Sequence, residues 1–175
     1  MPSDMTPLTQ AFVHQSLAAA KNRVRASKAV QDGQPGAALA LRALAEAQEV
    51  HAKKALTFLR GRIGTSAENL ALALQEAREM AVYALGWTVQ SEAEADKAAG
   101  ALLTQMARAV QSHLALPGLT QPGQTQGDAG ARYYVCVICG HVHASVAGGA
   151  SAAGHAPGRC PVCQAVPEKF NEVTV

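Results

Sequence analysis

CVICG, residues 136–140, and CPVC, residues 160–163, are the two stretches that set the character of the C-terminal part of this chain. In each, two residues separate a pair of cysteines, so both thiolates can converge on one ion from a tight turn. Gly140 follows the first pair, where the backbone must turn toward the sulfur atoms, and glycine tolerates the positive φ of such a turn. The spacing predicts one metal site with four sulfur ligands: Cys136, Cys139, Cys160 and Cys163.

Two disulfides are the alternative use of four cysteines. The N-terminal sequence, MPSDMTPLTQ, has no basic segment followed by an apolar one, so we expect no secretory signal and a cytoplasmic location. A reducing cytoplasm disfavours structural disulfides, which favours metal binding. A tetrahedral site of four sulfurs accepts either iron or zinc, and the spacing alone does not choose between them.

The composition of the chain favours helices. Apolar residues make up 49% of the 175 residues while aromatic residues make up only 4%, because much of the apolar content is alanine, the best helix former. The net charge of +2 is too small to recruit nucleic acid or an anionic membrane surface. No stretch has the roughly 20 continuous apolar residues of a transmembrane helix, so we expect no membrane partner.

Four helices are predicted before the cysteines, in residues 7–31, 35–61, 66–88 and 92–116. Thr6-Pro7 is typical of a helix start, and Thr65 to Glu68 and Ser91 to Glu94 each have the pattern of a capping box. Residues 117–130 are rich in Gly, Pro and polar residues and predict a linker. Residues 131–175 lose helical periodicity, and their core is too small to be stable without a metal.

The residues around the cysteines resemble a known family. YYVCVICGHVH at 133–143, CPVCQA at 160–165 and Phe170 closely resemble the rubredoxin-like tail of rubrerythrins, which binds one redox-active iron and passes single electrons. Residues 145–157 form a longer, Gly/Ala-rich run than that family has, and we expect a mobile loop that does not touch the metal. Three histidines are interpreted as surface or loop residues, because four thiolates already fill the site: His141, His143 and His155.

The resemblance extends to the helices and implies a mainly α protein. It implies a ferritin-like four-helix bundle over residues 1–116, the linker at 117–130, and a small rubredoxin-like metal-binding domain over 131–175. In rubrerythrins the bundle holds a di-iron centre, with Glu and Glu-x-x-His ligands from facing helices. The matching ligands here are His51, Glu76, Glu79 and His113. Three glutamates of the family pattern are replaced by Gln15, Gln48 and Val110.

The missing carboxylates change what the bundle can hold. Two carboxylates would leave half the charge of two ferrous ions uncompensated in a low-dielectric core, so a normal di-iron centre is not expected. Three interpretations stay open: one divalent ion of Fe, Mn or Zn among the four matching residues, a metal-free polar network of the same residues, or a nonstandard two-metal or cofactor site.

The resemblance therefore implies a redox metalloprotein. Electron transfer would pass through iron in the four-cysteine site, with zinc as a possible substitute, and an altered bundle site would decide whether peroxide is reduced. The family pattern also implies a homodimer and a redox partner protein that the sequence does not identify. The alternative is a non-enzymatic metal-binding or interaction protein with a structural zinc ribbon.

Overall fold

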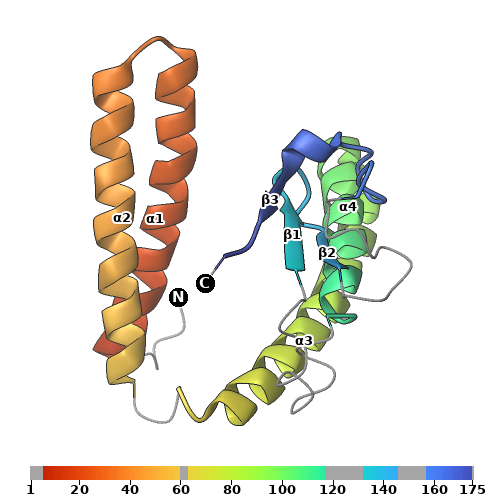
Figure 1. Cartoon of the computed structure of the whole chain (residues 1–175), viewed down its shortest axis with the longest axis horizontal. Coiled ribbons are helices and arrows are strands. Elements are labelled where there is room, and N and C mark those ends of the chain that lie inside the picture. Colours follow the sequence, from red (N-terminus) through yellow and green to blue (C-terminus); the bar gives the residue numbers. More distant parts are fainter. Residues whose placement is uncertain (1–5, 60–62, 117–131, 146–156, 175) are drawn as a thin grey trace. The chain divides into compact units, whose positions relative to one another are not determined.

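The computed structural model describes residues 6–59, 63–116, 132–145 and 157–174 (Figure 1). The chain forms two compact units, Met1–Gly64 and Thr65–Val175. The first unit holds helices α1 (Pro7–Gln31) and α2 (Pro35–Phe58). The second holds the remaining elements: α3 (Ser66–Ala93), α4 (Lys97–His113), β1 (Arg132–Cys136), β2 (Val142–Ser145), the short 3₁₀ helix η2 (Pro167–Lys169) and β3 (Phe170–Glu172).

Helices α1 and α2 lie side by side as an antiparallel hairpin (Figure 1). Thr6 caps α1 as predicted, accepting a hydrogen bond from the backbone N–H of Thr9, and Asp32 ends the helix. The buried face of the hairpin is made mostly of alanines at seven-residue and three-residue spacings: Ala19 and Ala26 on α1, and Ala38, Ala45, Ala52 and Ala55 on α2. Such small side chains let two helices pack closely along a narrow seam.

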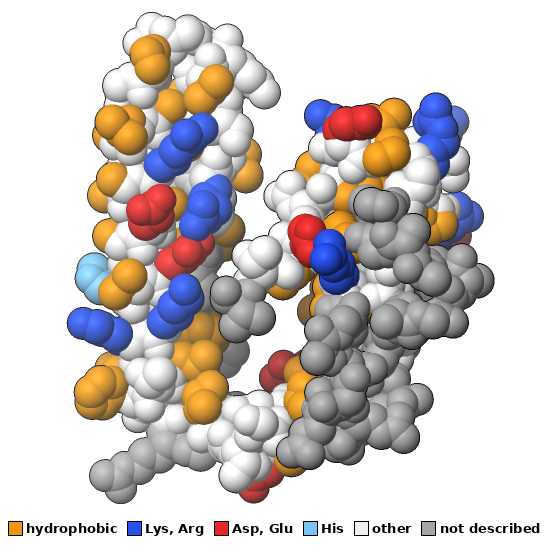
Figure 2. Space-filling model, viewed as in Figure 1, with side chains coloured by type: hydrophobic (Ala, Val, Ile, Leu, Met, Phe, Trp, Pro, Cys, Tyr) orange, Lys and Arg blue, Asp and Glu red, His pale blue; other side chains and the backbone are white. Residues whose placement is uncertain are grey.

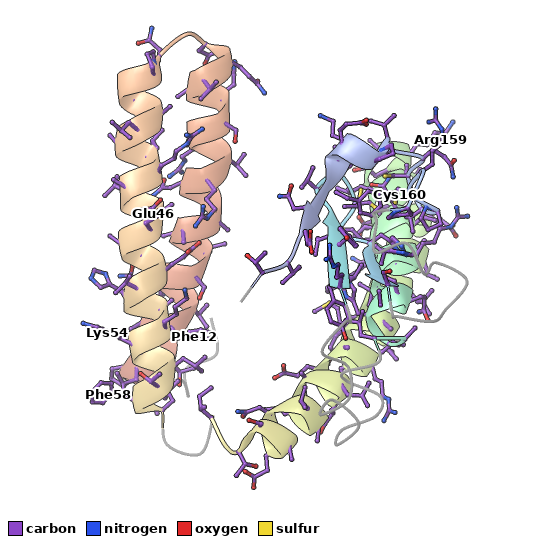
Figure 3. All side chains as sticks on the ribbon, viewed as in Figure 1. Phe12, Glu46, Lys54, Phe58, Arg159 and Cys160 are labelled. Atoms are coloured by element: carbon purple, nitrogen blue, oxygen red, sulfur yellow. The ribbon has the colours of Figure 1, made fainter. Side chains whose placement is uncertain are left out.

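Large apolar side chains of this hairpin lie mainly outside the alanine seam. Leu39, Leu44 and Phe58 of α2 have exposed fractions of 70%, 53% and 74%, and Figure 2 shows hydrophobic side chains interspersed with charged ones along the hairpin. Phe58, the last residue of α2, and Phe12, near the start of α1, lie toward the same open end of the hairpin (Figure 3). The seam itself therefore buries mainly small residues rather than large apolar ones.

Helices α3 and α4 form the second hairpin. Thr65 and Glu68 make the predicted capping box at the start of α3. The second predicted box, at Ser91 and Glu94, is wrong because α3 continues to Ala93 and Ser91 is buried, with its hydroxyl bonded back to the carbonyl of Thr88. Asp96 caps α4 instead, accepting hydrogen bonds from the N–H groups of Ala98 and Ala99.

A small antiparallel sheet follows, with strand order β2-β1-β3. The pairs Tyr134–His143 and Val135–Asn171 fix the register of the central strand against its two neighbours. Cys136 ends β1 opposite Phe170, so the strand delivers the first cysteine directly to the end of the sheet. The sheet contacts α4 through β2, which attaches the cysteine-bearing part to the second helical hairpin.

In the part of the chain that the structure describes, four α-helices followed by a three-stranded sheet confirm the predicted mainly α fold class. The predicted linker, 117–130, and nearly all of the loop at 145–157 lie outside the described residues. The domain division at 1–116 and 131–175 stays a prediction. Within the described residues, no helix is both long and apolar enough to cross a membrane.

Candidate metal centre

The first cysteine turn grows out of β1. The N–H of Cys136 donates to the carbonyl of His141, and the N–H of Gly140 donates to the carbonyl of Cys136, both at 2.9 Å. Gly140 has a φ of +76°, as its place after the cysteine pair predicted. The turn thus closes on itself through the backbone and brings Cys136 and Cys139 to one side.

The second cysteine turn repeats this backbone pattern with different residues. The N–H of Cys160 donates to the carbonyl of Ala165, and the N–H of Gln164 donates to the carbonyl of Cys160, again both at 2.9 Å. Gln164 occupies the position equivalent to Gly140 and also has a positive φ, +61°. Its carbonyl accepts a hydrogen bond from Nη1 of Arg159 at 3.0 Å, which helps to hold this turn.

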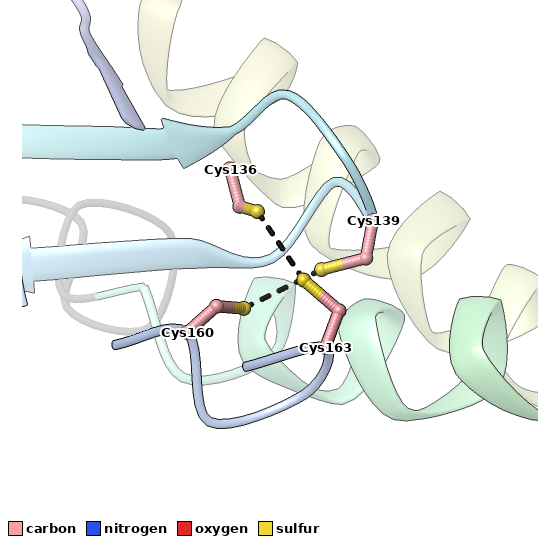
Figure 4. A group of neighbouring side chains, drawn as sticks. All are labelled: Cys136, Cys139, Cys160 and Cys163. Atoms are coloured by element: carbon pink, nitrogen blue, oxygen red, sulfur yellow. Dashed lines mark hydrogen bonds between the residues drawn. The ribbon is translucent and has the colours of Figure 1, made fainter. Parts of the chain in front are cut away.

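The two turns face each other, and their four side chains point toward a common centre (Figure 4). The Sγ atoms of Cys136 and Cys163 are 3.6 Å apart, those of Cys139 and Cys160 are 3.5 Å apart, and all four lie within 4.8 Å of one another. A disulfide requires roughly 2 Å between sulfurs, and the four cysteines are free. Four sulfurs about 2.3 Å from one tetrahedral ion would be about 3.8 Å apart, so this cluster can hold a metal ion.

Backbone N–H groups donate hydrogen bonds to three of the four sulfurs, those of Cys136, Cys139 and Cys163. Burial raises the pKa of Cys136, but hydrogen bonds from the backbone of Ile138 and Cys139 and from neighbouring thiols outweigh it and lower that pKa to about 7. Burial raises the pKa of Cys139 and that of Cys163, although the N–H of His141 and that of Ala165, respectively, oppose this effect. Four crowded thiolates repel one another, so a bound cation is needed to keep all four ionised, and the donor set fits a metal.

One sulfur of each turn is sheltered and the other is partly open. Cys136 and Cys160 are buried, with exposed fractions of 1% and 0%, whereas Cys139 and Cys163 are of intermediate exposure. Two apolar side chains of the first turn are more than half exposed beside them, Val137 at 53% and Ile138 at 56%. The site is therefore close to the surface rather than enclosed in a deep core.

Helix α4 ends against the first turn. The hydroxyl of Ser112 accepts a hydrogen bond from the N–H of Val142 at 3.0 Å, and Nε2 of His113 lies 3.0 Å from the carbonyl oxygen of Gly140. His141 lies between these contacts. Its buried Nδ1 has no hydrogen-bond partner among the described residues, and burial and the nearby His143 and His113 lower its pKa. His141 is thus part of the packing around the turn rather than a plain surface residue.

The residues predicted to bind metal in the helices are placed as follows. Glu76 and Glu79 are exposed on α3, and Glu79 accepts a hydrogen bond from Gln75 at 2.9 Å. His113 is directed to Gly140, and His51 is exposed on α2 in the other compact unit. Among the described residues, the four cysteines are the one group of three or more potential ligands within reach of a single ion. The four-residue helical site stays a prediction.

Gln48, which replaces a glutamate of the family pattern, is used within the α1–α2 seam. Its Oε1 accepts a hydrogen bond from Nδ2 of the buried Asn22 at 3.0 Å, and Nη1 of Arg25 donates to Oδ1 of Asn22 at 3.0 Å. The amide of Gln48 is therefore engaged by a side chain of the neighbouring helix. No feature of the sequence predicted this pairing, nor the contacts of Ser112 and Arg159 with the cysteine turns.

Helices followed by a four-cysteine cluster on a small antiparallel sheet make up a rubrerythrin-like fold, which confirms the resemblance seen in the sequence. Solved structures of nigerythrin, a protein of the rubrerythrin family, are similar over nearly the whole chain. The mixed-valence form has a TM-score of 0.53 at 17% identity, covering 98% of this chain and 90% of that one. The fully reduced, all-ferrous form has a TM-score of 0.51 at 17% identity, covering 99% and 92%.

No protein-family model and no curated protein matches this chain. At 17% identity, the likeness to nigerythrin shows the fold.

Proposed function

We propose that this protein is a rubrerythrin-like redox metalloprotein that transfers single electrons through one iron ion in the four-cysteine site. The observation that carries the proposal is the convergence of four free thiols, two from each of two matching turns, within a nigerythrin-like fold. The nigerythrin structures describe mixed-valence, partially reduced and all-ferrous states of that protein. A fold that supports such iron chemistry there makes iron the better candidate here.

Each part of the site has a role in this proposal. Iron bound by four thiolates supplies a one-electron couple between ferric and ferrous forms. The sheltered sulfurs of Cys136 and Cys160 limit the access of water, while the partly open Cys139 and Cys163 place two sulfurs near the surface. The exposed Val137 and Ile138 give a redox partner protein an apolar edge on which to dock beside those sulfurs.

Anaerobic purification from iron-rich medium tests the proposal. We expect about one iron per chain with visible thiolate-to-iron charge-transfer bands that bleach reversibly on reduction. A colourless protein that contains zinc after the same growth would contradict it. That outcome would support the second candidate, a non-enzymatic protein with a structural zinc ribbon, which the tetrahedral donor set also suits.

The helical metal and the oligomeric state are separate proposals with separate measurements. A metal ion held by His51, Glu76, Glu79 and His113 requires two ions per chain rather than one, and peroxide reduction is proposed only if that second ion is found. We propose a homodimer on the family pattern alone, and light scattering of the metal-loaded protein at several concentrations measures it. A monomeric mass at all concentrations would exclude the dimer without affecting the four-cysteine site.

A further inference from the structure

The peptide after the first cysteine pair has hydrogen bonds on both of its sides. Its N–H, which belongs to His141, is bonded to Cys139. Its carbonyl, which belongs to Gly140, is 3.0 Å from Nε2 of His113 at the end of α4. Because a carbonyl oxygen can only accept, the proton in this contact must be on Nε2.

The peptide after the second cysteine pair has the same arrangement. Its N–H, from Ala165, is bonded to Cys163, and its carbonyl, from Gln164, accepts from Nη1 of Arg159 at 3.0 Å. The two turns are thus alike in the side chains that support them as well as in their own backbone hydrogen bonds. In each, an outer side chain donates to a peptide that in turn donates to the second cysteine of the pair.

The geometry of a peptide makes such a chain effective. The carbonyl oxygen and the N–H of a trans peptide point in opposite directions, so a donor on the oxygen polarises the N–H on the far side. Chains of hydrogen bonds strengthen one another, by roughly 10–30% per bond in condensed phases. Hydrogen bonds to the sulfurs are among the features that set the reduction potential of an iron–sulfur site, because they stabilise negative charge there.

We propose that His113 and Arg159 are outer positioning residues of the metal centre, each of which holds and polarises the peptide that is bonded to Cys139 or Cys163. The two outer residues come from different parts of the chain. Arg159 precedes Cys160 in the same segment, so its contact is local, whereas His113 lies on α4, 26 residues before Cys139. We call each chain of hydrogen bonds, from the outer side chain through the peptide to the cysteine, a relay. The relay that starts at His113 connects the second helical hairpin to a proposed metal ligand. The predicted consequence for electron transfer rests on the function proposed above.

A test that needs no redox activity uses amide resonances of the full-length, zinc-loaded protein. In His113→Ala, the amide proton of His141 should move upfield because its hydrogen bond to Cys139 is weaker, while that of Ala165 stays in place. In Arg159→Ala, the amide proton of Ala165 should move and that of His141 should stay. His113→Gln retains an N–H donor at about the same reach, so the His141 resonance should stay near its position in the unchanged protein. This variant also keeps the test open if His113→Ala does not fold.

Two control variants test whether the shifts come from polarisation of the peptides. One loosens the contact between α4 and the first turn, and the other removes a positive charge elsewhere in the same sheet. Ser112→Ala removes the other contact between α4 and the first turn without touching the Gly140 peptide, so the His141 amide should stay within a small fraction of the His113→Ala shift. Arg132→Ala removes a cation of the same module that lies 3.6 Å from Glu172 and contacts neither peptide. If Ser112→Ala or Arg132→Ala moves both amides as much as the test variants do, or if His113→Ala moves neither, the relay is refuted.

The iron-loaded protein gives the redox readout. His113→Ala and Arg159→Ala should each lower the reduction potential, because the more negative ferrous form loses stabilisation, and each should weaken metal binding by about tenfold, the lower end for partners outside the ligand set. Unchanged potentials with a normal iron couple would refute the relay and leave the proposed function intact. Shifted amide resonances in a protein that binds zinc and shows no iron couple would refute the proposed function and leave the relay intact.

Discussion

The two compact units of this chain are stabilised in different ways. In Met1–Gly64, two long helices pack along a seam of alanines that also holds a partly buried polar pair, Asn22 and Gln48. In Thr65–Val175, the largest fully buried side chains among the described residues are Cys136, at the end of β1, and Cys160, in the second cysteine turn. A small sheet that buries cysteine sulfurs at its end depends on what those sulfurs bind, while a helical seam depends on close packing. Each unit should therefore respond to its own kind of substitution and ignore the other kind.

The largest expected effect is the loss of the metal. Cys139→Ser should release the ion and remove most protection from hydrogen exchange in residues 132–145 and 157–174, because structural metal binding contributes about 10 kcal/mol or more to such folds. Protection in α1 and α2 should not change. Metal analysis and hydrogen exchange resolved by segment measure both results. Val137→Ser, at an exposed position of the same turn, is the matched control and should keep the metal.

A sheet that stays protected in Cys139→Ser without metal would contradict this prediction. It would mean that β1, β2 and β3 have enough packing of their own, and the contrast between the units would disappear.

A second prediction concerns the alanine seam. Ala45 is fully buried, with an exposed fraction of 0%, so Ala45→Leu should force α1 and α2 apart and destabilise that hairpin by about 1–3 kcal/mol. The metal content should not change. Ala47→Leu places the same side chain at an exposed position of α2 and should be close to neutral. Denaturant unfolding followed by helical circular dichroism measures the difference, and equal midpoints for the two variants would argue against a close-packed seam.

How far the sequence could predict this structure depends on the distance over which the interactions act. The cysteine spacing, the positive φ at Gly140 and the cap at Thr65 are local features, and each was predicted. The family resemblance placed Gln48 at a position where that family has a glutamate ligand. Its actual partner, Asn22, is 26 residues away, and periodicity along one helix does not reveal what the neighbouring helix offers.

The same limit explains the contacts of the candidate metal centre that the sequence did not predict. The family resemblance placed His113 among the ligands of a helical metal, yet its ring reaches Gly140 in the cysteine turn, 27 residues further along. Ser112 and Val142 are joined in the same way. Such contacts depend on how α4 docks against the sheet, which short motifs do not encode. Arg159 contacts Gln164 over only five residues, but no known turn pattern marks that pair.

A third and smaller effect is expected at the polar pair of the first unit. Asn22→Ala would leave the amide of Gln48 without its partner in the seam, at a cost of about 1–2 kcal/mol in the free energy of unfolding. The double variant Asn22→Leu with Gln48→Leu should recover much of that loss, since replacing both partners by apolar groups can be nearly neutral. Metal affinity of the cysteine site should stay the same in all three proteins. A double variant no more stable than Asn22→Ala would show that Asn22 and Gln48 contribute more to the seam than a hydrogen bond to each other.

The smallest expected effect compares Gly140 with Gln164, the two positive-φ positions of the cysteine turns. No atom lies within 4 Å of a Cβ added to Gly140, so Gly140→Ala tests backbone strain alone, which costs about 1 kcal/mol in the left-handed region. Gln164→Gly should have the opposite sign, because glycine relieves that strain, and a gain of up to about 1 kcal/mol is expected. Chelator competition on the zinc-loaded protein measures both, as a weaker affinity for the first variant and a tighter or equal one for the second. Equal losses in the two variants would show that the side chain of Gln164 stabilises its turn and that the two turns, alike in backbone, are not equivalent in energy.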